Sequence, residues 1–150
     1  MDIFLKRELL FRGKRKDNGE WVTGQLSLQQ PPVVLDRLDY FIKFSDYYIE
    51  VNNIRYLIVP ETLGRYTGFN TYSNYDDELH KIFSGDLCYV TEFDFEGKDT
   101  QHLCRVIFGC ENDTYFTDVN SDWCIAFNDV NDIESDIKLI GNIYDNPELL

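Results

Sequence analysis

Hydrophobic positions recur mostly every second residue, the period of a β-strand whose two faces lie in different surroundings. In residues 20–28, Val22, Gly24, Leu26 and Leu28 share one face and polar residues occupy the other. The same kind of segment predicts further strands at residues 8–12, 38–44, 47–51 and 54–59. We therefore expect a β meander in the amino-terminal part of the chain.

Short polar turns separate these segments. The turn at residues 14–19 ends in Asn18-Gly19, a pair that favours the left-handed backbone conformations of a tight hairpin. Asn52-Asn53 is a second expected turn. Residues 8–28 are thus predicted to form a hairpin whose first arm is basic.

The two-residue period resumes in the carboxy-terminal half. It predicts strands at residues 87–93, 102–108, 115–119, 123–127 and 137–144. Residues 128–136 have the composition of a polar, acidic loop. Residues 82–90 read Ile-x-x-Gly-Asp-Leu-x-x-Val and are followed by an expected hairpin, a pattern associated with SH3-like barrels. In it, Gly85 permits a positive φ and Asp86 can cap the turn.

One stretch has a helical pattern instead. In residues 75–83, Leu79, Ile82 and Phe83 fall on one helical face, and acids at residues 76–78 favour a helix amino terminus. We therefore expect a mainly β protein with one short helix at most. The expected organisation is a β meander over residues 1–60, a connecting segment over 61–86 and a small SH3-like barrel-type sheet over 87–150, packed as one unit.

Composition narrows the possible functions. Hydrophobic residues make up 43% of the 150, which is enough for a buried core, and the formal net charge is −13, from 27 acids and 14 bases. Such a surface repels phosphate backbones, so general nucleic-acid binding is disfavoured. Residues 1–16 run against this trend, with six bases and two acids.

The sequence also suggests where the protein resides. No apolar run approaches the ~20 residues that cross a bilayer, and the first residues lack the apolar core of a secretory signal. We expect a cytoplasmic protein without a membrane partner, in which the four cysteines stay reduced.

Several blocks of sequence resemble the YopX family. They are RELLFRGKR at 7–15, NGEWVTG at 18–24, VPETLGRYTG at 59–68, IFSGD at 82–86 and IGNIYDNPELL at 140–150. The resemblance implies a β-rich protein encoded by a phage or prophage, in the cytoplasm of a bacterial host, and it carries no established activity. Two features depart from the family pattern: residues 70–81 are longer and more acidic, and Ser84 stands where an acid is usual.

Catalytic and metal signatures are weak. His80, Cys88, His102 and Cys104 could in principle approach one another, but no two cysteines have the short spacing of a zinc site, and cysteine within an apolar strand is usually a core residue. The chain has no nucleophile elbow and no phosphate loop. We expect no enzyme, no cofactor and no metal.

The basic hairpin is the first candidate interaction site. Arg12, Lys14, Arg15 and Lys16, together with Trp21, could contact phosphates and stack on a base. The competing interpretation is a hairpin tip kept soluble by charge, with the tryptophan packed on its sheet. Arg65 and Tyr66 are the second candidate.

These two residues lie between Gly64 and Gly68. They could contact a ligand or partner, or the glycines could serve a tight turn with the tyrosine packed inside. For the whole chain we expect a non-enzymatic protein-interaction module with an acidic surface, whose partner is an unknown host or phage protein or a second copy of the chain. The alternative is a small nucleic-acid-binding module that uses the basic hairpin.

Overall fold

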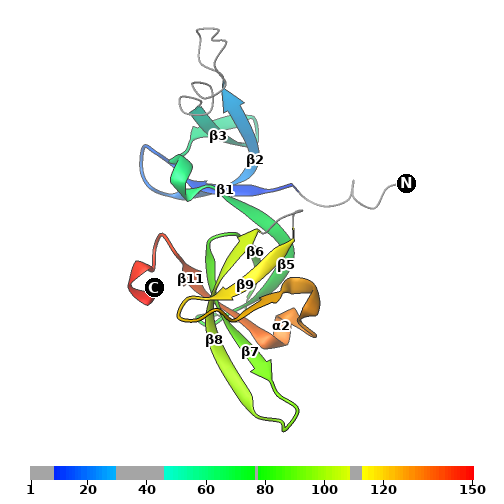
Figure 1. Ribbon diagram of the computed structural model, residues 1–150. Helices are drawn as coiled ribbons and strands as arrows, with labels where there is room; N and C mark the ends of the chain where they lie inside the picture. Colours follow the sequence, from blue (N-terminus) through cyan, green and yellow to red (C-terminus); the bar gives the residue numbers. More distant parts are fainter. Residues whose placement is uncertain (1–8, 30–45, 77, 109–112) are drawn as a thin grey trace, which may run out of the picture. The chain divides into compact units, whose positions relative to one another are not determined.

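The computed structural model describes residues 9–29, 46–76, 78–108 and 113–150 (Figure 1). The chain divides into two compact units, Met1–Arg65 and Tyr66–Leu150. The division falls within strand β5 (Gly64–Ser73), which gives its first two residues to the first unit and the rest to the second.

The first unit is an antiparallel arrangement of short strands. These are β1 (Phe11–Lys14), β2 (Trp21–Gln29), β3 (Asp46–Val51) and β4 (Ile54–Leu57). β1 pairs with β2 and with the start of β5, and the order continues through β3 to β4. A single 3₁₀ turn, η2 (Pro60–Thr62), lies between β4 and β5.

Local turn residues set the hairpins of this unit as the sequence predicts. Gly19 has φ +75°, and its amide donates to the carbonyl of Arg15 at 2.9 Å. Asn52 and Asn53 both have positive φ, which asparagine tolerates better than most residues. The β1–β2 hairpin and the β3–β4 turn are therefore confirmed, whereas the strand predicted at residues 38–44 lies outside the described residues.

The second unit is also built of strands. They are the remainder of β5, β6 (Leu79–Phe83), β7 (Asp86–Phe93), β8 (Asp99–Phe108), β9 (Thr114–Asp118), β10 (Cys124–Ala126) and β11 (Ile137–Asn142). Their order is β10-β9-β8-β7-β11-β5, with β6 on β5. All the pairings are antiparallel except β11 with β5, which is parallel.

The core of the second unit lies on the inward faces of these strands. Its buried members are Ile82, Cys88, Val90, Cys104, Val106, Phe116, Phe127 and Ile137. Phe116 stacks on Phe127 with ring centroids 3.9 Å apart. Cys88 and Cys104 are directly opposite each other on β7 and β8, and both thiols are buried. Burial is the main reason that the pKa of the Cys104 thiol rises to about 12.

The turn that opens β7 follows the predicted chemistry. Gly85 has φ +90°. The buried Asp86 carboxylate accepts a hydrogen bond from the Phe83 amide at 2.7 Å. A β-carbon at residue 85 would also lie 3.1 Å from the Tyr144 ring, so glycine serves both the backbone angle and the packing.

The prediction of a helix at residues 75–83 is wrong. Its second half is strand β6, which pairs with β5 and buries Ile82 and Phe83. Its first half is a bend in which the Asp76 carboxylate accepts from the Glu78 amide at 3.0 Å. Such local bonds compete with a helical turn, and the strand pairing then decides the outcome.

The α-helix in the described part of the chain lies instead in the segment expected to be a loop. It is α2 (Ile133–Asp136), and the side chain of Asp132 caps it by accepting from the amide of Ser135. The described part of the chain is thus mainly β with one short α-helix, as predicted, and the likeness to an SH3 barrel stays a prediction. None of the helices formed by the described residues has the length and apolarity to cross a membrane.

Candidate functional site: a basic pocket beside the β1–β2 hairpin

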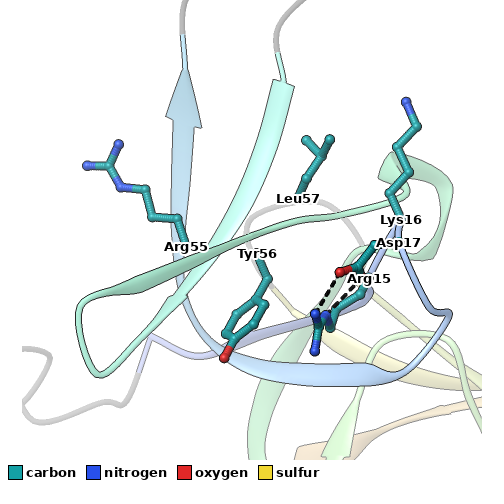
Figure 2. A pocket seen from close by; sticks show the side chains of 6 residues that line it. All are labelled: Arg15, Lys16, Asp17, Arg55, Tyr56 and Leu57. Atoms are coloured by element: carbon teal, nitrogen blue, oxygen red, sulfur yellow. Dashed lines mark hydrogen bonds and ion pairs between the residues drawn. The ribbon is translucent and has the colours of Figure 1, made fainter.

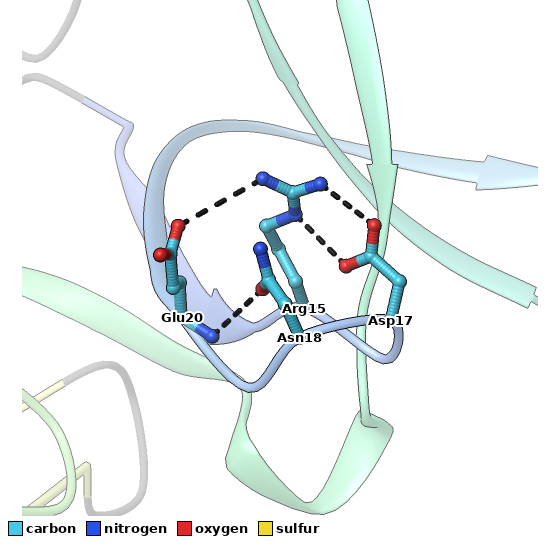
Figure 3. A network of polar contacts seen from close by, with 4 residues as sticks. All are labelled: Arg15, Asp17, Asn18 and Glu20. Atoms are coloured by element: carbon cyan, nitrogen blue, oxygen red, sulfur yellow. Dashed lines mark hydrogen bonds and ion pairs between the residues drawn. The ribbon is translucent and has the colours of Figure 1, made fainter.

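Arg15 is held in place by its neighbours in the hairpin turn (Figure 3). Its guanidinium donates to both carboxylate oxygens of Asp17, from Nε at 3.0 Å and from Nη2 at 2.7 Å. Nη1 lies 3.9 Å from the carboxylate of Glu20. The two-pronged bond fixes the plane of the guanidinium as well as its position.

Protonation of this pair is insensitive to pH near neutrality. The hydrogen bond from Arg15 holds the pKa of Asp17 below its usual range, and the same bond raises the pKa of Arg15. Both groups therefore stay charged at neutral pH.

Backbone pairing brings β4 beside this turn. The backbone of Arg15 forms an isolated antiparallel β-bridge with Ile58, and the amide of Lys16 donates to the carbonyl of Leu57 at 2.8 Å. The guanidinium carbon of Arg15 consequently lies 4.5 Å from the centre of the Tyr56 ring, a distance typical of a cation–π contact.

The result is a pocket of about 410 Å³, which we call the basic pocket (Figure 2). Its lining residues are Arg15, Lys16, Asp17, Arg55, Tyr56 and Leu57. Three cations and one carboxylate leave the lining net positive, while Tyr56 and Leu57 supply apolar surface. Arg55 also lies 3.6 Å from Glu50, and more than half of its side chain is exposed. The pocket can hold an anionic group together with a ring or aliphatic chain.

The other two hairpin bases lie elsewhere. Arg12 and Lys14 are two residues apart on β1, and both lie over the ring of Trp21, at 4.8 and 5.4 Å. Neither of them lines the basic pocket. The tryptophan face is thus contacted by two cations of its own hairpin.

Arg65 and Tyr66 fall on the two sides of the unit boundary. Arg65 pairs with Phe11 across β1 and β5. Tyr66 is buried in the second unit, where its hydroxyl donates to Asn70 at 2.8 Å and its ring lies 5.6 Å from Phe83. The six residues chosen from the sequence therefore lie in four surroundings, and only Arg15 and Lys16 share a pocket.

Sequence reasoning missed Arg55, Tyr56 and Leu57 as pocket residues. The alternation in β4 marks Arg55 as outward-facing, but it carries no information about what the strand faces. The only signals available were the bases at residues 12–16 and, well apart from them in the sequence, a strand with an outward arginine beside an aromatic residue.

The residues considered for zinc do not gather. Cys88 and Cys104 lie in the core, whereas His80 pairs with Asp76 at 2.9 Å on the surface. In the parts of the chain that are described, the atoms of Asp76, Glu78 and His80 lie within 4.8 Å of one another. Both acids are exposed, and the Asp76 carboxylate already accepts from the Glu78 amide and contacts the His80 ring.

His102 forms a half-buried polar cluster in the second unit. Its ring stacks on Trp123 with centroids 3.8 Å apart, and Nδ1 lies 2.7 Å from the Asp118 carboxylate. Nε2 lies 3.5 Å from the carboxylate of Glu92. The cluster joins β7, β8 and β9 to the segment that precedes β10.

We expect Asp118 to make this unit sensitive to acid. The hydrogen bond with His102 lowers the pKa of Asp118 in the folded protein. A carboxyl whose pKa is lower folded than unfolded stabilises the fold above its unfolded pKa of about 3.9, and the contribution is lost as the pH falls through the folded value. Between pH 7 and pH 3, the free energy of unfolding measured with urea should fall less for Asp118→Asn than for the wild type. Equal losses would contradict this role, and Asp122→Asn, an exposed acid nearby, is the control.

Comparison with known proteins identifies the family. The family model for YopX protein matches residues 10–150, nearly the whole chain. No curated protein and no solved structure matches this chain. The matched region includes the hairpin, the basic pocket and the complete second unit. The chain therefore belongs to the YopX family.

Proposed function

We propose that this protein is a phage or prophage accessory protein that acts without catalysis, in the bacterial cytoplasm, by binding another protein through an acidic surface. The observation that supports this proposal is the distribution of charge between the two units. Residues 1–65 contain ten bases and nine acids, a net charge of +1, whereas residues 66–150 contain four bases and eighteen acids, a net charge of −14. The acidity is thus a property of one folded unit.

The acids of the second unit are displayed to solvent. Those that are exposed are Asp76, Glu78, Asp94, Glu96, Asp99, Asp113, Asp122, Asp129, Asp132, Glu134, Asp145 and Glu148. Only Lys81 and Lys98 are exposed bases among the described residues of this unit. A surface of one sign raises the association rate with a partner of opposite charge and discourages other partners. The partner that fits is a protein with a basic groove.

A second candidate function rests on the basic pocket. Arg15, Lys16 and Arg55 beside Tyr56 combine cations with an aromatic ring, as single-stranded nucleic-acid sites do. The net charge of −13 opposes this candidate, because distant acids repel the phosphate backbone. If it holds, an oligonucleotide should be shifted in a gel at low salt, and Lys16→Glu with Arg55→Glu should abolish the shift. Absence of a shift with DNA or RNA, single- or double-stranded, would refute nucleic-acid binding by the basic pocket.

The main proposal is tested by affinity capture during prophage induction. The tagged chain should recover a partner at low salt and less of it at moderate salt, because screening weakens exposed charge pairs. Asp129→Asn with Glu134→Gln neutralises two exposed acids of the second unit and should reduce recovery. Asp46→Asn with Glu61→Gln makes the same change of charge in the first unit and is the matched control.

Two results would contradict the proposal. One is recovery of nothing above a tag-only control at either salt concentration. The other is an equal effect of the two double variants, which would mean that the acids of the second unit have no special part in binding.

A further inference from the structure

The hairpin of β7 and β8 presents aromatic side chains to solvent. Phe95 at its tip is fully exposed, and Phe93 at the end of β7 is 56% exposed. Figure 1 shows these strands as a long hairpin that extends beyond the rest of its sheet. Exposure of a phenylalanine ring to water is unfavourable in free energy, so Phe95 at this tip is a candidate contact residue.

The turn that carries Phe95 is ordered by its own hydrogen bonds. The Asp94 carboxylate accepts from the amides of Glu96 and Lys98, at 2.9 and 2.7 Å. The Asp94 amide donates to the carbonyl of Lys98 at 3.1 Å, and Gly97 has φ +78°. The aromatic side chain is therefore held on a preformed turn, which reduces the entropy lost on binding.

Acids surround this tip. Residues 92–99 contain Glu92, Asp94, Glu96 and Asp99 against the single base Lys98, a net charge of −3. A site that accepts the tip needs an apolar space for one ring and a positive rim.

The basic pocket of the first unit has these properties. Its volume of about 410 Å³ exceeds the roughly 150 Å³ of a cavity that holds a benzene ring. Tyr56 and Leu57 offer apolar surface, and the three cations Arg15, Lys16 and Arg55 outnumber the single carboxylate, that of Asp17. The tip and the pocket are thus complementary in size, polarity and charge.

We propose that the β7–β8 tip of one molecule docks in the basic pocket of a second copy of this chain. Phe95 enters against Tyr56, and the acids beside it face Lys16 and Arg55. The proposal deepens the proposed function, since it rests on the acidic unit acting by protein binding and names one partner. Each molecule offers one tip and one pocket, so the contact is head to tail and extends into a chain of copies unless it closes into a ring.

Sedimentation velocity of the purified protein tests this contact. Over about two orders of magnitude in concentration, the weight-average sedimentation coefficient of the wild type should rise as copies associate. Phe95→Ser should lower the association constant at least about tenfold, because it removes the buried ring. Tyr75→Ser, which removes another exposed aromatic side chain of the same unit, should leave association unchanged. Circular dichroism checks that each variant is folded.

A mixing experiment then identifies the two surfaces. Lys16→Glu with Arg55→Glu inactivates the pocket but keeps the tip, and Phe95→Ser does the reverse. Each variant alone should remain monomeric, and an equimolar mixture should form a one-to-one dimer and nothing larger.

Three results would overturn the inference: a monomer at every concentration of the wild type, undiminished association of Phe95→Ser, or a mixture that stays monomeric. The proposed function fails in a different way. A wild type that stays monomeric but still captures a partner through the acids at 129 and 134 refutes the self-association alone.

Discussion

Replacement of Phe116 by alanine should lower the free energy of unfolding of residues 66–150 by about 3–5 kcal/mol. Phe116 is completely buried and stacks on Phe127, so the truncation removes apolar contacts from the centre of the core and leaves a cavity there. The two tryptophans divide between the units, with Trp21 in the first and Trp123 in the second. Urea unfolding followed by fluorescence in a Trp21→Phe background therefore reports on this unit.

Two variants control this measurement. Phe116→Leu keeps most of the apolar volume and should cost clearly less than alanine, whereas Tyr75→Ala alters an exposed ring and should cost little. A loss below about 1 kcal/mol for Phe116→Ala would mean that the core does not depend on this ring.

Gly24→Ala should destabilise the first unit by about 3 kcal/mol, the upper end of the usual cost of overpacking. A β-carbon at this residue would lie 2.3 Å from the backbone carbonyl oxygen of Glu50, and 2.9 Å from Val51. The carbonyl belongs to β3, which pairs with β2, so it can retreat only if the two strands separate. Urea unfolding of the variant in a Trp123→Phe background, followed by Trp21 fluorescence, measures the loss.

Thr23→Ala is the neighbouring control, because its side chain is exposed on the same strand. If Gly24→Ala were as stable as this control, the close approach of β2 and β3 at this residue would be refuted. Destabilisation of the first unit should also remove self-association, since the basic pocket belongs to that unit.

Turns with local chemistry could be predicted from the sequence. Asn18-Gly19, Asn52-Asn53 and Gly85-Asp86 all form the turns expected of them, because the backbone angles they favour depend on few other residues. The strands around these turns were also predicted, because the two-residue period is likewise a local pattern in the sequence. Resemblance to the YopX family, judged from short blocks, is likewise confirmed by the match over residues 10–150.

Features that depend on distant pairing could not be predicted. Leu79, Ile82 and Phe83 fit a helical face, yet pairing with β5 makes their segment a strand. The basic pocket depends on Arg15 meeting Ile58, a contact between segments well apart in the sequence. The parallel pairing of β11 with β5 is of the same kind.

The candidate site shows this difference most clearly. The bases of the hairpin were visible in the sequence, but their partners decide what each can do. Trp21 lies under Arg12 and Lys14, while Tyr56 lies under Arg15. Sequence pattern locates the charges, and only the strand pairing shows which of them line a pocket.

The opposed cysteines of β7 and β8 have a chemical consequence. Thiols react with oxidants and alkylating reagents as thiolates, and a pKa of about 12 leaves almost no thiolate at Cys104 near neutral pH. Cys88 beside it is equally shielded from solvent. Cys124, in contrast, is exposed. The sheet thus keeps its inner sulfur atoms unreactive for as long as it stays closed, and their reactivity appears only when β7 and β8 part.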